Sequence, residues 1–460
     1  MSKLKIAFIG AGSRSFAGRT MADVLLSDPL NEFDLELVLM DVIAEHLGET
    51  ERFCRRGVEQ LGRKATVVTT TDLDTAVDGA DFVVTALEVN RYLYWAQDFH
   101  VPRLYGSEQI YGENGGPGGI FHALRNMGPI LQVAQAMERL CPDAWLLNFS
   151  NPESKLCEAL DRLTKIKAVG LCHGVFIGLG QIAQLLERPE ETLQTAACGF
   201  NHFTWFQEIR DRQTGEDLYP LLRQKEARAD PLAEWDELAL SRVLFRTYGL
   251  WPSPSTNHHG EYIRWAGEFL ASTPLQFYYD PAQGHPWQTG KIPSLIYSMA
   301  SNPTSRPLFA QNTDAAQANP DAAQANALAS DFQMAKSREV LVPIMEGIAC
   351  GIRGEIPAII YPNRGSIPGI QEDMTVEMPA IVDKDGLHPC PMQPLPEAVA
   401  AMIRVQGSIQ KLIVEAYAEK SRNKLLQALL LDPTVKSYRG AVVMLDEMLR
   451  LQKDLLPEFA

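Results

Sequence analysis

Short apolar runs alternate with longer amphipathic stretches over the first 175 residues. Six of these runs have the length and composition of buried strands, and they span residues 4–9, 35–40, 65–69, 81–86, 144–149 and 167–171. Stretches with helical spacing, such as 18–26 and 44–61, lie between them. This alternation is typical of βαβ units. We therefore predict a Rossmann-type doubly wound parallel sheet over residues 1–176.

The pattern changes after residue 176. A helical stretch at 179–186 precedes a strand-like run at 203–210, and extended segments fall within 356–380. Apolar residues at helical spacing fill 394–452, whereas 311–327 is rich in Ala, Gln and Asn and predicts a surface loop or arm. These features predict an α+β domain over 177–460, and the whole chain is expected to have an α/β fold.

The junction between the first predicted strand and the first predicted helix is rich in glycine. In such a turn the backbone N–H groups approach a pyrophosphate at the start of a helix. We predict nucleotide contacts from Gly10, Gly12, Ser13, Arg14 and Ser15, of which Ser15 replaces the third glycine of the usual fingerprint. The alternative is a glycine-rich turn that binds no nucleotide.

Asp41 follows the second predicted strand directly. A carboxylate at this place can accept hydrogen bonds from a ribose 2′-hydroxyl and would repel a 2′-phosphate. The sequence therefore favours NAD over NADP.

Charge and composition exclude several classes of partner. The 460 residues carry a net charge of −15, which disfavours nucleic acid and anionic membranes as main partners. No apolar run reaches the roughly 18 residues that a membrane span needs, and the first strand leaves no room for a signal peptide. The seven cysteines are scattered and predict free thiols. We expect a cytoplasmic protein.

Polar residues with catalytic or ligating potential follow the later predicted strands. Cys172 and His202 are soft to borderline ligands and could supply half of a transition-metal site, although a buried thiol and a core imidazole are the commoner interpretation. Asn151, fixed before a proline, could bind sugar hydroxyls or simply begin a turn.

Two further clusters carry possible chemistry. Glu113 lies in the glycine-rich segment 112–119 and is either a substrate-binding carboxylate or a charge at a helix start. Tyr262 follows two histidines and a glutamate, and as a general base it would need a nearby cation to lower its pKa from about 10. The alternative for Tyr262 is a packed aromatic residue beside Trp265.

These motifs together resemble glycoside hydrolase family 4, the NAD- and metal-dependent glycosidases, including its α-galactosidase and α-glucosidase members. The likeness runs from end to end, with order and spacing agreeing across the chain. The matching segments are FIGAGS (8–13), GPGG (116–119), NFSNP (148–152), CHG (172–174), GFNH (199–202), HGEY (259–262), YPNRGSIPGI (361–370) and QALLLDP (427–433).

The resemblance implies a role for each motif. Cys172 and His202 would bind the divalent metal, for which we expect manganese, and Asn151 and Asn201 would bind the substrate. Tyr262 would remove the proton at C2 of the sugar. The acid for the departing group stays open among His173, Glu113 and a water molecule.

The implied reaction is a redox-assisted elimination. NAD⁺ takes a hydride from C3, the C2 proton is removed, the aglycone leaves, water adds and the hydride returns. The resemblance also implies a fold like that of lactate and malate dehydrogenases, and a homodimer or homotetramer.

The substrate is less well defined by the sequence. A neutral, non-phosphorylated α-hexoside is favoured. The alternative is a C6-anionic sugar, such as an α-uronide or a sulfoquinovoside, with Arg91 pairing the anion. Two alternatives to a glycosidase are an NAD-dependent 2-hydroxy acid dehydrogenase and an NAD-sensing regulator.

Overall fold

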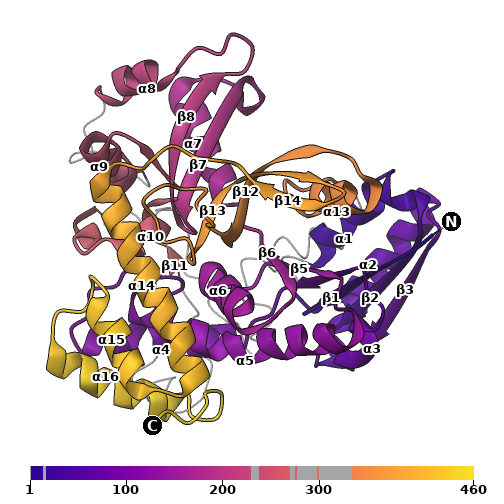
Figure 1. Ribbon diagram of the computed structural model, residues 1–460, viewed down its shortest axis with the longest axis horizontal. Helices are drawn as coiled ribbons and strands as arrows, with labels where there is room; N and C mark the ends of the chain where they lie inside the picture. The colour runs from indigo at the N-terminus through magenta and orange to yellow at the C-terminus, as the bar shows by residue number, and fades with distance from the viewer. Residues whose placement is uncertain (1, 14–16, 229–237, 270–274, 277–297, 300–333) are drawn as a thin grey trace.

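The computed structural model describes residues 2–13, 17–228, 238–269, 275–276, 298–299 and 334–460 (Figure 1). A large mixed sheet runs through the molecule in the order β3-β2-β1-β4-β5-β6-β12-β13-β7-β8-β9, with β14 paired to β13. Its strands are β1 (Lys3–Ile9), β2 (Asp34–Met40), β3 (Ala65–Thr70), β4 (Phe82–Thr85), β5 (Trp145–Asn148), β6 (Lys167–Gly170), β7 (Leu193–Phe200), β8 (Phe203–Asp211), β9 (Trp251–Ser253), β12 (Gly354–Pro362), β13 (Thr375–Asp383) and β14 (Gly386–Pro389). A separate pair is formed by β10 (Leu275–Gln276) and β11 (Ser298–Met299).

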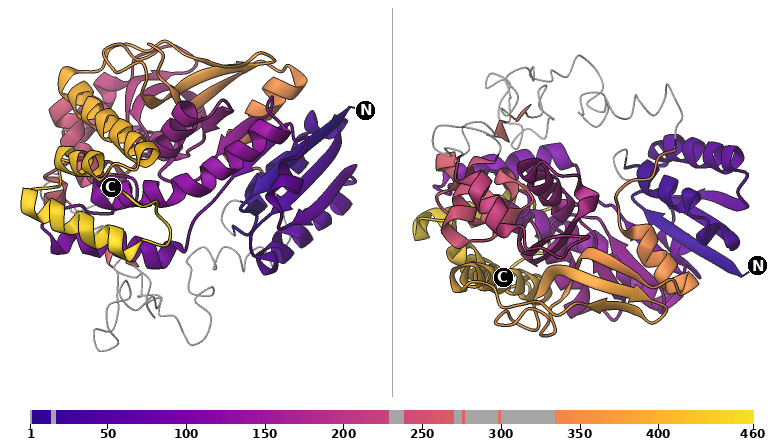
Figure 2. Two further views of the ribbon diagram at one scale, coloured as in Figure 1. Left: turned by 60° about the horizontal axis from the view of Figure 1, so that its bottom comes forward. Right: turned by 90° about the horizontal axis from the view of Figure 1, so that it is seen from above.

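Helices cover this sheet and form a cluster at the C-terminal end of the chain. They are α1 (Ala17–Leu26), α2 (Ala44–Leu61), α3 (Leu73–Val77), α4 (Arg91–Leu104), α5 (Gly116–Leu140), α6 (Glu153–Leu163), α7 (Gly174–Leu186), α8 (Tyr219–Glu226), α9 (Ala239–Tyr248), α10 (Thr256–His259), α13 (Leu341–Cys350), α14 (Glu397–Glu419), α15 (Arg422–Leu431) and α16 (Tyr438–Leu451). The N-terminal strands and the C-terminal helices lie at opposite ends of the molecule (Figures 1 and 2).

The predicted doubly wound sheet is confirmed. All six predicted strands are present within one residue of their expected bounds, and β1 to β6 pair only in parallel with one another. The α+β character of the second part is also present, since β12 and β13 are antiparallel and α14 to α16 fill the predicted helical end. The predicted arm at 311–327 lies outside the described residues.

The two predicted domains share one sheet. The parallel part ends at β6, whose Gly170 pairs with Ile360 of β12 in an antiparallel bridge. The predicted boundary at residue 176 therefore separates the parallel part of a continuous sheet from its antiparallel part. The boundary itself stays a prediction.

Helix α5 forms the centre of the main core. Its side chains Phe121, Leu124 and Met127 are completely buried and belong to one cluster with Ile413 of α14 and Leu445 of α16. Figure 1 shows α5 running from the C-terminal helices towards α3. Helix α5 thus packs between the parallel part of the sheet and the C-terminal helices. Among the described residues, no helix has both the length and the apolar composition that crossing a bilayer requires.

A buried ion pair fixes the C-terminal helices to α4 and α5. Arg125 Nη2 lies 2.9 Å from Asp98 Oδ2, and both side chains are 1% exposed. Gln452, just after α16, donates to Asp98 at 3.0 Å and accepts from Arg125 at 3.1 Å. The pair therefore satisfies its polar atoms largely within the protein.

We predict that Asp98→Ala strongly destabilises the protein. It leaves the Arg125 guanidinium buried without its carboxylate, and losing one partner of a buried pair costs about 3–5 kcal/mol. The thermal unfolding midpoint should fall by several degrees. Asp74→Ala is the control, because its pair with Arg139 is exposed and should contribute little. Equal effects of the two substitutions would contradict this prediction.

Candidate functional site

The turn after β1 has room only for glycine. Gly10 has a φ of +87°, and a Cβ atom there would lie 2.4 Å from the carbonyl oxygen of Ala86. The N–H groups of Gly10 and Ala11 both donate to the Met40 carbonyl at 2.9 Å. The turn is therefore held at the carboxyl ends of β1 and β2, where a doubly wound sheet binds nucleotides.

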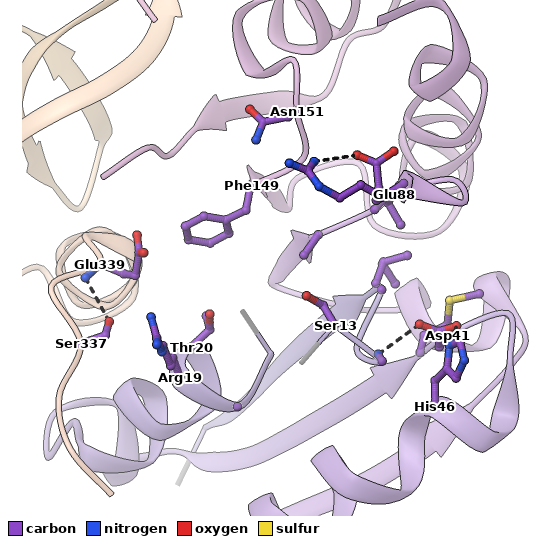
Figure 3. Close-up of a pocket in the computed structure, with 18 of the residues that line it drawn as sticks. Ser13, Arg19, Thr20, Asp41, His46, Glu88, Phe149, Asn151, Ser337 and Glu339 are labelled. Carbon is purple, nitrogen blue, oxygen red and sulfur yellow. Dashed lines mark hydrogen bonds and ion pairs between the residues drawn. The ribbon is translucent and has the colours of Figure 1, made fainter. Parts of the chain in front are cut away.

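Asp41 stands opposite this turn. Its Oδ2 accepts the N–H of Gly12 and its Oδ1 accepts the N–H of Ile43, both at 3.0 Å (Figure 3). These bonds fix the carboxylate while each oxygen retains a further lone pair for a ribose hydroxyl. Arg14 and Ser15 lie outside the described residues, so their predicted contacts stay predictions.

A large cavity extends from this turn across the carboxyl edge of the sheet. Its volume is about 1830 Å³, and its lining includes Gly12, Ser13 and Asp41 together with Asn151 and His173. Figure 3 shows Asp41 and Asn151 on separate sides of it, with Ser13 between them. The predicted cofactor-binding and sugar-binding residues therefore border one continuous space.

The NFSNP motif contains polar side chains that bind the protein itself and one that lines the cavity. Asn148 accepts from Thr85 Oγ1 at 2.9 Å and donates to the Ser150 carbonyl at 3.0 Å, whereas Ser150 Oγ accepts the Leu87 N–H at 2.7 Å. Asn151 is different, because its buried Oδ1 has no protein partner. Its side chain is thus available to a ligand in the cavity.

Cys172 and His202 border a second, smaller cavity of about 170 Å³. It adjoins the large one, since the two share several lining residues. The shared residues are Glu113, Phe149, Asn151, His173 and Ile177. The predicted metal ligands and the predicted sugar-binding asparagine therefore lie on the walls of one compound site.

His202 is placed by a tight turn between β7 and β8. Phe200 pairs with Phe203, so Asn201 and His202 form the turn, and His202 adopts a left-handed φ of +64°. Such a conformation is uncommon for a residue other than glycine and often marks a functional site. Burial, followed by His258 and other nearby cations, moves the pKa of His202 well below its ordinary value, and its buried Nδ1 has no protein partner.

The surroundings of Cys172 favour the protonated form of its thiol. Burial and then the carboxylates of Glu153 and Glu377 raise the pKa of the thiol well above its ordinary value. A bound cation would reverse this effect, because a coordinating thiol loses its proton. Among the described residues, no three His, Cys, Asp or Glu side chains converge as a ready ligand set. Cys172 and the neutral His202 thus fit a metal that keeps open positions for substrate.

Asn201 belongs to the same turn, and its side chain forms a hydrogen bond with Cys172. Its Nδ2 lies 3.3 Å from Glu377 on β13, and Glu377 also accepts from Thr204 Oγ1 at 2.7 Å. The Oδ1 atom of Asn201 is buried without a protein partner. Asn201 does not line either cavity directly.

Arg91 is paired inside the protein. Its guanidinium binds the carboxylate of Glu113, lies 3.4 Å from Glu88 and stacks over the Trp95 ring at 4.6 Å. His122 adds to this network, because its Nε2 lies 2.8 Å from Glu88 and its Nδ1 lies 2.8 Å from the Glu113 carbonyl oxygen. Two carboxylates, one guanidinium and one imidazole thus form one network, in which Glu113 and His122 are buried and Arg91 and Glu88 are partly buried.

The network holds both carboxylates ionised. Burial would raise the pKa of Glu113, but Arg91, His258 and His122 together lower it. Burial acts in the same direction on Glu88, and His122 and Arg91 outweigh it and bring the pKa of Glu88 to about 2. Glu113 is therefore suited to accept hydrogen bonds and poorly suited to donate a proton.

His173, the other candidate acid, occupies the N-cap of α7. Its side chain is half-exposed, lines both cavities and places Nδ1 3.6 Å from Glu339 Oε1. Figure 3 shows Glu339 pointing towards the cavity from the segment before α13.

Tyr262 lies behind the walls of both cavities. It is 3% exposed, its ring packs against Phe200 and Phe203, and its hydroxyl is 3.4 Å from the Asn201 carbonyl oxygen. Burial, followed by Glu261 and other carboxylates, raises the pKa of Tyr262 well above 10. The structure therefore brings the phenol next to the His202 turn but not to the cavity surface.

Several site residues were missed by sequence reasoning. Four of them are deeply buried beside a predicted motif, namely His122, Lys155, Glu153 and Glu377, whereas Glu88 is only partly buried. Only Glu153 carried a usable signal, since it follows the NFSNP motif directly and its side chain accepts the Leu171 N–H at 2.7 Å. The others are single polar residues whose contacts cannot be read from their neighbours in the sequence.

The chain matches the models of a known enzyme family over most of its length. The model of the family 4 glycosyl hydrolases matches residues 5–188, and the model of their C-terminal domain matches residues 197–435. An α-galactosidase of Rhizobium meliloti is 30% identical over 100% of this chain and 90% of its own length. An α-glucosidase of Erwinia rhapontici is 29% identical over 98% of both chains.

A solved structure shares the fold. It is a 6-phospho-α-glucosidase from gut microorganisms in complex with NAD and Mn²⁺, with a TM-score of 0.77, 21% identity and full coverage of both chains. The family matches favour the predicted glycosidase over the dehydrogenase and regulator alternatives. The chain therefore belongs to family 4 of the glycosyl hydrolases and is a glycosidase.

Proposed function

We propose that this protein cleaves neutral α-hexosides with the help of NAD and a divalent metal ion. One observation carries the proposal: the cavity that starts at the Gly12 turn continues to Asn151 and His173 and adjoins the cavity of Cys172 and His202. A redox-assisted cleavage needs a dinucleotide and a metal at the same sugar ring, and this connection supports that requirement.

The residues present fit both groups. The Gly12 turn and Asp41 would hold the dinucleotide, whereas Cys172 and His202 would hold the metal beside Asn151, whose Oδ1 is buried without a partner. When bound, the dinucleotide supplies reversible hydride transfer at C3 of the sugar, and the metal supplies Lewis acidity at neighbouring oxygens.

The side chains of the protein then have distinct tasks. Asn151 orients the sugar hydroxyls, and the ionised Glu113 accepts a hydrogen bond from another hydroxyl. Tyr262 is the proposed base for the C2 proton, which the contact of its hydroxyl with the Asn201 carbonyl, next to His202, supports. His173 is the proposed acid for the departing group, because it lines both cavities and Glu113 is held ionised.

The charges of the site favour a neutral sugar. Among the described residues, the lining of the smaller cavity contains the ionised Glu113 and neither Lys nor Arg, and it also contains Glu153, whose pKa burial and Glu377 raise well above its ordinary value. Arg91, the expected partner of a C6 anion, is already bound by Glu113 and lies close to Glu88. An anionic C6 group would have to displace these carboxylates. The α-glucosidase and α-galactosidase relatives support the α anomer.

A panel of nitrophenyl glycosides tests the proposal as a whole. We expect α-glucosides or α-galactosides to be cleaved at least about 10-fold faster than the 6-phosphates, uronides or 6-sulfo sugars, because like charges in a binding site are strongly unfavourable. Protein stripped of NAD should be inactive and recover when NAD⁺ is added, without net accumulation of NADH. Full activity of the stripped protein, or a preference for an anionic sugar, would refute the corresponding part of the proposal.

The metal site makes a second prediction. Excess chelator should abolish glycoside cleavage and Mn²⁺ should restore it, since Cys172 and His202 leave a metal exchangeable. Cys172→Ser should bind Mn²⁺ at least about 10-fold more weakly by calorimetry, as losses around a metal commonly cost 10–100-fold. Cys390→Ser is the control, because Cys390 follows β14 and lines neither cavity. Equal affinity of the two variants would exclude Cys172 as a ligand.

Tyr262→Phe tests the base. It keeps the packing against Phe200 and Phe203 and removes only the hydroxyl, so the protein should stay folded. Turnover should fall at least about 100-fold, because general bases contribute about 10²–10⁴-fold. In heavy water the wild type should place deuterium at C2 of the product. Wild-type turnover by the variant would assign the proton to another group.

A homodimer or homotetramer and a cytoplasmic location stay predictions from the sequence. Sedimentation of the purified protein would settle the first.

A further inference from the structure

We propose that Glu261 is a positioning residue that holds Glu113 and Tyr262 in a fixed relation on two sides of the same loop. The inference deepens the proposed function, on which the roles of Glu113 and Tyr262 rest. Glu261 itself lines neither cavity and is fully buried. It is therefore not a catalytic residue.

The first observation is the set of partners of the Glu261 carboxylate. It accepts the N–H of Glu113 at 2.7 Å and the N–H of Asn114 at 3.1 and 3.2 Å, and it also accepts the N–H of Gly115. Three consecutive N–H groups thus converge on one side chain, directly before the first turn of α5. This arrangement presents donors only, and the positive end of the helix dipole adds to it.

The second observation is the contact on the other side of the loop. A Cβ atom on Gly115 would lie 2.6 Å from Glu261 Cβ and 2.9 Å from Tyr262 Cε1. The loop backbone therefore packs directly on the Tyr262 ring. Because Glu261 and Tyr262 are neighbours in the short 3₁₀ turn Gly260–Tyr262, any shift of the loop relative to Glu261 also shifts it relative to the phenol.

Several other backbone groups of the loop are also held. Lys155 donates to the Asn114 carbonyl, His122 contacts the Glu113 carbonyl at 2.8 Å, and Asp432 accepts the Gly116 N–H. The Glu113 carboxylate is bound by Arg91. Glu113 is thus restrained at its backbone N–H, its carbonyl and one carboxylate oxygen, and Glu261 supplies the restraint that also reaches Tyr262.

Two carboxyl oxygens suit this place better than an amide. Burial, followed by the nearby Glu113, raises the pKa of Glu261 to about 8, so the group is largely protonated near neutral pH, and the N–H groups of the loop oppose that rise because they favour the carboxylate. A glutamine would keep one acceptor oxygen, but its NH₂ group would face N–H donors. An aspartate is one methylene shorter and would not reach all three groups without moving the loop.

The test compares Glu261→Gln and Glu261→Asp with Glu158→Gln. Glu158 is a matched control, because it is also buried, accepts the Thr375 N–H at 2.7 Å and lines neither cavity. For the Glu261 variants we expect kcat to fall about 10–100-fold, with a smaller change in KM, since small misplacements of reacting groups cost about that much. The isotope effect of deuterium at C2 should increase, and NAD affinity should not change.

Hydrogen exchange adds a readout that needs no turnover. The amides of residues 112–116 should exchange faster in Glu261→Gln than in the wild type or in Glu158→Gln. If the wild type releases no sugar, the proposed function fails, while the exchange rates still decide on the loop. Folded Glu261 variants with unchanged exchange and kinetics like those of Glu158→Gln would overturn the inference.

If the Glu261 variants do not fold, Gly115→Ala serves the same purpose. Its added methyl group separates the loop from Glu261 and Tyr262 without removing a polar group. We expect the same fall in kcat and the same faster exchange of residues 112–116. Wild-type kinetics and exchange in this variant would equally overturn the inference.

Discussion

The site depends on the register of four parallel strands. β1 pairs with β4, β4 with β5, and β5 with β6, each without a shift, so that Ile9, Thr85, Asn148 and Gly170 stand at one edge of the sheet. The segments that follow these strands carry the glycine turn, Glu88, Asn151 and Cys172. A slip of one residue in any pair would turn the side chains of that strand to the other face. Hydrogen bonds between strands thus set the spacing on which the chemistry relies.

The charged side chains of the site pair with one another within the protein. Arg91 is matched with Glu113 and Glu88, and His122 presents both ring nitrogens to acceptors. Buried carboxylates are costly unless they are paired and hydrogen bonded, and this network meets both conditions. This pairing supports the proposed preference for a neutral sugar. A neutral sugar would use the remaining lone pairs, whereas an anion would have to compete with carboxylates that are already in place.

The sequence was sufficient for features with local signals. Strand lengths, the glycine turn and the polar residues at strand ends all depend on neighbours in the chain, and so the parallel sheet and the surroundings of Asn151 and Cys172 could be predicted. Other features arise from partners far apart along the chain. Glu261 binds a loop almost 150 residues before it, and nothing near HGEY indicates that partner. The pairing of Arg91 with Glu113 and Glu88 was missed although they are 22 and three residues away, since a lone arginine beside aromatic residues does not reveal which carboxylates face it.

Burial makes the protonation state of Tyr262, the proposed base, depend on whether a cation is bound nearby. Its hydroxyl contacts a carbonyl oxygen, and the charged groups that most affect it are carboxylates, so the phenol keeps its proton in the structure described here. A phenolate becomes accessible only if positive charge is brought close, and the proposed metal ligand His202 is one residue beyond the carbonyl that Tyr262 contacts. On the proposed roles, the nearby carboxyl groups would suppress proton abstraction in a site without its metal. The same side chains would then fix the geometry of the loop and make the strength of the proposed base depend on the charge of what the site contains.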